Sequence, residues 1–70
     1  MPEILRVHLK VARAREGLTQ EELAARVGVT RKTINTIERG HFLPSTLLAL
    51  KLARALHSRV EELFSLEETA

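Results

Sequence analysis

Two basic residues and a threonine stand where a short helix could present them together. Arg31 and Lys32 are followed one helical turn later by Thr36, and Ile34 and Ile37 supply the apolar positions between and after them. In a helix that buries both isoleucines, the other three side chains project from the opposite face. Arginine and lysine donors match the N7 and O6 acceptors of guanine, and a threonine methyl can contact that of thymine. The pattern indicates a helix that can read base edges.

The surrounding residues predict two short helices joined by a tight turn. Thr19 can cap a helix that starts near residue 20, and Glu22 can reach back to its amide in a capping box. Gly28 follows the apolar stripe of that helix, at the place where a left-handed residue ends it at least cost. Thr30 is a second cap, for a helix that runs to about residue 39. Helices joined by so short a turn cross steeply.

The stretches GLTQEELAARVGV, TINTIERG, ALKLARAL and VEELF together resemble the phage-repressor (Cro/cI-like, XRE) helix-turn-helix regulators. The resemblance spans roughly residues 5–66, which is nearly the whole chain. It implies an all-α, compact five-helix bundle of the lambda-repressor-like DNA-binding type. Residues 1–70 would form this single domain, with the helix-turn-helix at about 20–39. In such proteins the second helix of the motif lies in the major groove of double-stranded DNA.

The same resemblance assigns roles to individual side chains. Arg31, Lys32 and Thr36 occupy the family's base-contacting positions, and Gln20 matches a glutamine that holds a phosphate and braces the recognition helix. The expected backbone or flanking contacts are Gln20, Thr30, Thr33, Asn35 and Arg39. Two of these have simpler readings, since Thr30 could be only a cap and Arg39 only a solvated cation.

Arg13 and Glu38 stand where phage repressors carry an ion pair between the first helix and the end of the recognition helix. The resemblance therefore implies a structural pair, whose main effect would be to fix how the two helices are held. The alternative is two solvated charges.

The remaining helices are expected at about 3–16, 46–56 and 59–65, with a frayed tail from Leu66. Leu5 shares a helical face with two later apolar residues, which favours the first of these helices. At the start of the last helix, His57 stands where relatives commonly have glycine. Ser58 and Glu61 can form a capping box there.

A homodimer is expected, because repressors of this kind place two recognition helices about one DNA turn, ~34 Å, apart on a pseudo-palindrome. Two surfaces could form the interface. The first, favoured by the resemblance, comprises Leu47, Leu50 and Val60, and the second is an extra apolar stripe on the first helix, comprising Ile4, Val7 and Val11.

Length and composition are consistent with a small intracellular domain. A chain of 70 residues buries only about 60% of its unfolded surface. It has no cysteine, no signal-type segment and no apolar run long enough to span a membrane, so a cytoplasmic protein is expected. The net charge is only +2, but three of the four charged residues between Val27 and Leu43 are basic. The placement of charge therefore matters more than its sum.

Other classes of function find little support. The chain has no aspartate, cysteine or tyrosine, and no Ser-His or paired-carboxylate arrangement that a small helical core would bury, so we do not expect an enzyme. His8, His41 and His57 lack ligand spacing, so no metal is expected. No cofactor is expected, and no small-molecule effector is evident, because the single expected domain leaves no second domain to receive one. The rival is a protein-interaction module, an adaptor or antitoxin-like partner that has lost DNA binding. Arg31 and Lys32 beside Gln20 argue against it.

Overall fold

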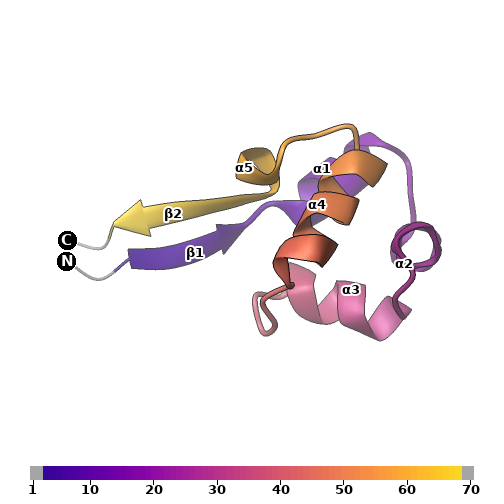
Figure 1. Ribbon diagram of the computed structural model, residues 1–70, viewed down its shortest axis with the longest axis horizontal. Coiled ribbons are helices and arrows are strands. Elements are labelled where there is room, and N and C mark those ends of the chain that lie inside the picture. Colours follow the sequence, from indigo (N-terminus) through magenta and orange to yellow (C-terminus); the bar gives the residue numbers. More distant parts are fainter. Residues whose placement is uncertain (1–2, 69–70) are drawn as a thin grey trace.

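The computed structural model describes residues 3–68 as a helical bundle from which a two-stranded ribbon projects (Figure 1). The elements in chain order are β1 (Glu3–Val7), α1 (Leu9–Arg15), α2 (Gln20–Val27), α3 (Arg31–Glu38), α4 (Thr46–Ala55), α5 (Val60–Leu63) and β2 (Phe64–Glu68). The two strands are antiparallel neighbours and bring the two ends of the described chain together.

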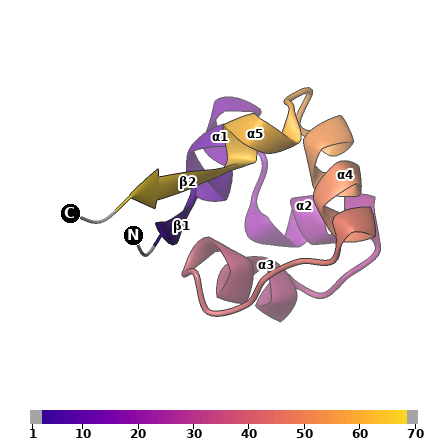
Figure 2. The same cartoon turned by 60° about the vertical axis from the view of Figure 1, so that its left-hand side comes forward.

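Apolar residues from all five helical segments form the core. The fully buried large side chains are Leu9, Leu23, Ile34, Ile37, Leu52, Leu56 and Leu63. The small Ala24 of α2 is also buried, and α2 packs on both α3 and α4. Figure 2 shows α3 along one edge of the bundle, with α1 and α5 on the other side. One face of α3 is thus held by the core while its other face remains open.

The local signals of the helix-turn-helix are confirmed. Thr19 accepts a hydrogen bond from the Glu22 amide, and the Glu22 carboxylate accepts one from the Thr19 amide at 2.8 Å. Hydrogen bonding from Thr19, chiefly from its amide, holds the pKa of the Glu22 carboxyl below its ordinary value. Gly28 ends α2 with φ of 77°, a left-handed conformation that strains residues with a Cβ. Thr30 then caps α3 by accepting from the Thr33 amide at 3.2 Å.

The first helix is shorter than predicted, because residues Glu3–Val7 are a strand. Val7 pairs with Phe64 and Leu5 with Leu66, so apolar side chains meet across the ribbon. The all-α description and the helix at 3–16 are therefore wrong for this segment. Neighbouring residues of a strand point to opposite faces, so Ile4 and Val7 do not lie on one side. The predicted helical stripe of Ile4, Val7 and Val11 does not exist as a continuous surface.

The C-terminal end also differs from the prediction. Helix α5 is the short segment Val60–Leu63, so the predicted helix at 59–65 is too long. The chain continues as strand β2 over Phe64–Glu68, so the prediction of a frayed tail from Leu66 is wrong as far as Glu68. Residues 69 and 70 lie outside the described part. The predicted capping box of Ser58 and Glu61 is wrong by one residue. The Arg59 amide donates to Glu62 at 2.7 Å, while the Ser58 hydroxyl donates to the carbonyl of Leu56.

His57 adopts a left-handed conformation with φ of 52°. This is the position at which glycine is common in the family that the sequence resembles. The turn that it makes is closed by the Ser58 amide, which donates to the Ala53 carbonyl at 2.9 Å. This bond across the end of α4 is the one that normally accompanies a left-handed residue. The backbone geometry is therefore kept at a cost in strain of about 1 kcal/mol.

Candidate nucleic-acid interface

The exposed face of α3 carries the basic side chains singled out in the sequence. Arg31 and Lys32 are exposed at its first turn, while Ile34 and Ile37 are fully buried behind them. Within residues 3–68, neither basic side chain forms an ion pair. Both cations are therefore available to a ligand on this side of the molecule.

The three threonines of this region use their hydroxyl groups within the protein. Thr30 and Thr33 share a hydroxyl–hydroxyl bond of 3.0 Å, in addition to the cap at the start of α3. The Thr36 hydroxyl donates to the Lys32 carbonyl at 2.7 Å, one turn earlier in the helix. Its proton is used, so an outside ligand would meet the Thr36 methyl group or the lone pairs of the oxygen.

Arg13 and Glu38 form a forked ion pair between α1 and the last residue of α3. Arg13 donates from Nε to Glu38 Oε2 at 2.6 Å and from Nη2 to Oε1 at 3.1 Å. A third bond runs from Nη1 to the Leu18 carbonyl at 2.8 Å. The Arg13 side chain is 14% exposed and that of Glu38 only 4% exposed. The hydrogen bond to Glu38 raises the pKa of Arg13, so the guanidinium stays charged.

Gln20, the first residue of α2, joins the same network. Its Nε2 donates to Glu38 Oε1 at 2.9 Å and to Asn35 Oδ1 at 3.2 Å. Both acceptors belong to α3, so one side-chain amide connects the two helices of the motif. An open hollow of about 450 Å³ lies beside this network and is lined by Arg13, Thr19, Gln20, Glu21 and Arg31. A backbone phosphate could approach α2 through this hollow.

Phe42 is a surface residue that the sequence reading did not assign to the interface. It lies in the loop between α3 and α4 and is 47% exposed. With Thr30, Lys32, Thr33 and Thr36 it lines a hollow of about 200 Å³ beside the recognition helix. In the sequence, Phe42 could have been singled out as an aromatic residue in the short loop directly after the helix-turn-helix.

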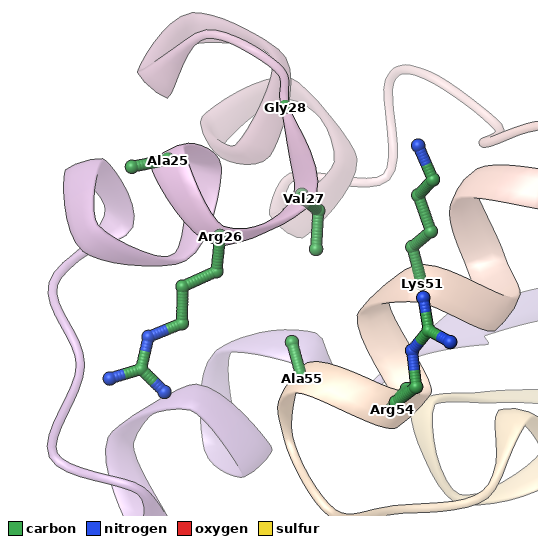
Figure 3. Close-up of a pocket in the computed structure, with 7 residues that line it drawn as sticks. All are labelled: Ala25, Arg26, Val27, Gly28, Lys51, Arg54 and Ala55. Carbon is green, nitrogen blue, oxygen red and sulfur yellow. The ribbon is translucent and has the colours of Figure 1, made fainter.

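A second basic region lies away from α3, between α2 and α4. Arg26, Lys51 and Arg54 border a hollow of about 550 Å³, with small residues at its base. Figure 3 shows that the Arg26 side chain runs away from those of Lys51 and Arg54. The three cations do not converge on one point, so the hollow lacks the geometry of a site for a single anion.

An apolar groove lies beside the ribbon, where α4, α5 and both strands meet. It has a volume of about 500 Å³ and is lined by Leu5, Leu43, Pro44, Thr46, Ala49, Leu50, Val60 and Phe64. Leu43 at its edge is 66% exposed, and Leu50 is 57% exposed. Leu47, the other outward residue of α4, is 64% exposed. Of the expected interface residues, Leu50 and Val60 thus line the groove and Leu47 stands on the same helix.

Residues 3–68 contain neither a metal-binding cluster nor a membrane-spanning helix. No group of three or more His, Cys, Asp or Glu side chains in this part of the chain is placed to hold a metal ion. None of its helices is long and apolar enough to cross a membrane.

Comparison with known proteins agrees with this geometry. A family model described as helix-turn-helix matches residues 9–63. The HTH-type transcriptional regulator YgzD of Bacillus subtilis (strain 168) is 50% identical over 60 residues, which cover 86% of this chain and 91% of that protein. An HTH-type transcriptional regulator of Methanothermobacter thermautotrophicus is 49% identical over 65 residues, with coverage of 91% and 94%.

Solved structures give the same result. The crystal structure of the restriction-modification controller protein C.AhdI from Aeromonas hydrophila has a TM-score of 0.72 and 39% identity, over 77% of this chain and 82% of that one. The regulator ClgR of Corynebacterium glutamicum has a TM-score of 0.73 and 31% identity, over 77% of this chain and 57% of that one. The chain therefore belongs to the helix-turn-helix family and is a transcriptional regulator of the phage-repressor-like (XRE) type, with a helix-turn-helix DNA-binding domain.

Proposed function

We propose that this protein binds a specific pseudo-palindromic site on double-stranded DNA as a homodimer, with α3 of each copy in the major groove. The observation that carries this proposal is the open face of α3. It presents Arg31 and Lys32 without ion-pair partners among the described residues, on a helix whose other face is fixed in the core. A helix held this rigidly can read bases because its donors are fixed relative to the backbone contacts.

The contacts are assigned as follows. Arg31 and Lys32 donate to guanine acceptors, at roughly 1–3 kcal/mol of discrimination for each good contact. Thr36, whose hydroxyl proton is used within the helix, offers its methyl to a thymine. Backbone or flanking contacts come from the start of α2 and the sides of α3, through Gln20, Thr30, Thr33, Asn35 and Arg39. Gln20 would use its main-chain N–H, because both Nε2 protons are used within the protein.

The second copy is proposed to pack on the groove beside the ribbon and on the outer face of α4. Leu43, Leu47 and Leu50 are all more than half exposed there, next to a concave apolar surface. Exposed leucines beside a groove can fill the groove of a two-fold-related copy, which buries both sets. Val11 is similarly exposed at 63%, but it no longer belongs to a continuous stripe. The groove is therefore the better candidate.

We infer that this protein acts as a repressor of transcription. A dimer bound over a promoter blocks the access of polymerase, and this needs nothing beyond the DNA-binding face and the second copy. The test is selection from random duplexes at a fixed, stated salt concentration. We expect a two-fold-symmetric sequence whose half-sites lie about one helical turn, ~34 Å, apart. Enrichment of no common sequence would refute specific binding and favour the interaction-module alternative.

A further inference from the structure

We propose that Phe42 is a specificity-determining residue, which forms with α3 a hollow that binds the 5-methyl group of a thymine in the major groove. This inference rests on the proposed function, because the hollow borders the DNA-binding face of α3. It goes beyond that function by adding a residue from outside the helix-turn-helix to the reading of bases, and by naming the chemical group that it reads.

Neither the core nor the proposed dimer groove accounts for Phe42. It is one of only two aromatic residues in the chain, and its side chain is 47% exposed and lies outside the core. The next residue, Leu43, lines the apolar groove at which the second copy is proposed to pack, whereas Phe42 does not line it. A single exposed apolar side chain is ordinary on a protein surface, so its neighbours decide what it can do.

The loop that carries Phe42 is tied to the end of α3. Gly40 is left-handed, with φ of 77°, and its amide donates to the Ile37 carbonyl at 2.9 Å. The His41 amide donates to the Thr36 carbonyl at 3.0 Å. Figure 2 shows this loop turning back beside α3 before it reaches α4. The backbone therefore places Phe42 relative to the helix that is proposed to read the bases.

The neighbours of Phe42 make the hollow largely apolar. It has a volume of about 200 Å³, and its other lining residues are Thr30, Lys32, Thr33 and Thr36. The Thr36 hydroxyl donates to the Lys32 carbonyl, and the hydroxyl groups of Thr30 and Thr33 bond to each other. These hydroxyl groups already have partners within the protein. The three threonine methyl groups and the phenyl ring are thus the surface that a ligand can bury there without breaking a hydrogen bond.

The hollow reaches the part of α3 that faces DNA in the proposed complex. If Ile34 and Ile37 define the inward direction, Lys32 lies about 10° and Thr36 about 50° from the outward direction, at roughly 100° per residue. Of the groups that base pairs present in the major groove, the thymine 5-methyl is the only methyl group, and the others are hydrogen-bond donors and acceptors. A phosphate suits the hollow poorly, because Lys32 is the only cation among the lining residues. The occupant that fits this chemistry is the thymine methyl.

The test removes that methyl group from the DNA. Each thymine of the selected duplex is replaced in turn, in one half-site, by deoxyuridine, which lacks only the 5-methyl group. At one position the wild-type protein should bind the deoxyuridine duplex about fourfold more weakly, as expected for one buried carbon. In Phe42→Ala this ratio of the two affinities should fall below about twofold, because the ring no longer covers the methyl group.

A second variant and a control use the same ratio. Thr36→Ser keeps the hydroxyl group that donates to the Lys32 carbonyl and loses only the methyl, so its ratio should also fall toward about twofold. His41→Ala changes an exposed residue of the same loop that does not line the hollow, and it should keep the fourfold ratio. Changes in stability or dimerisation affect both duplexes of a pair alike, so they cancel in the ratio.

The possible outcomes separate the inference from the proposed function. If selection yields a specific duplex but deoxyuridine has no effect at any position, or Phe42→Ala keeps the fourfold ratio, only the inference is overturned. An even loss by Phe42→Ala on every duplex would mean that the ring packs on the sugar-phosphate backbone, and this too would overturn it. If no duplex is selected, the proposed function fails and the inference fails with it. Should Phe42→Ala unfold, the ratio measured with Thr36→Ser decides in its place.

Discussion

Replacement of Glu38 by glutamine should destabilise the protein and weaken DNA binding, although it removes a negative charge from the DNA-binding helix. Glu38 is 4% exposed and accepts two bonds from Arg13 and one from Gln20. Removal of one partner from a buried pair costs about 3–5 kcal/mol. The Arg13 side chain keeps its bond to the Leu18 carbonyl and is 14% exposed, which lowers our expectation to about 2–4 kcal/mol.

The assay is thermal and urea denaturation alongside DNA titration. For a domain of this size the loss corresponds to about 8–32 °C in Tm, at roughly 4–8 °C per kcal/mol. Simple electrostatics predicts slightly tighter DNA binding, but one charge some ~10 Å from a phosphate is worth only ~0.4 kcal/mol in water. The loosened attachment of α3 should outweigh it.

A double variant, Arg13→Met with Glu38→Gln, provides the control for this prediction. It leaves no unpaired buried charge, and the glutamine oxygen can still accept from Gln20. Its loss of stability should therefore be smaller than the sum of the two single losses, by about 1–3 kcal/mol. An unchanged Tm together with tighter DNA binding by Glu38→Gln would refute the structural role of the pair.

Three further predictions follow from the same structure. Leu50→Glu should give a monomer by sedimentation, while Val11→Glu, a change at a similarly exposed valine, should leave a dimer; the reverse result would move the interface to α1. His57→Gly should stabilise the protein by about 1 kcal/mol in urea denaturation, because φ of 52° strains any side chain, and no gain would mean that the strain is absent. The Arg6 guanidinium lowers the pKa of Glu67 from its ordinary 4.5, so the pair stabilises the ribbon above that pH and loses its effect as the pH falls through the lowered value. Chemical shifts of the strands should report this loss, and they should not do so in Arg6→Ala.

The parts of the fold that the sequence predicts correctly are those with short-range causes. Thr19 with Glu22, the left-handed Gly28 and the Thr30 cap each act within a few residues, so their spacing is visible in the sequence. The Arg13–Glu38 pair was implied only by resemblance to the family, since its members lie far apart in the chain.

The ribbon was missed because its cause is not local. Each strand is five residues long, and its partner lies at the opposite end of the chain. Leu5 fits a helical face with Leu9 as well as it fits an alternating strand, so the pattern does not distinguish them. Only the pairing of Leu5 with Leu66 and of Val7 with Phe64 decides the matter. The bonds of Gln20 to Asn35 and Glu38 were likewise beyond the sequence, because they depend on how α2 crosses α3.

The central claim is that a dimer reads one DNA sequence through α3. Its most direct test is a titration of the wild-type protein with the selected pseudo-palindromic duplex and with a scrambled duplex of the same composition, at several salt concentrations. We predict that the selected duplex binds at least about 10³-fold more tightly. We also predict two protein chains on each selected duplex and a loss of ~10³–10⁵ in affinity between 50 and 200 mM salt, as for ~6–10 phosphate contacts. Equal affinities for the two duplexes, or one chain bound on the full site, would contradict the claim.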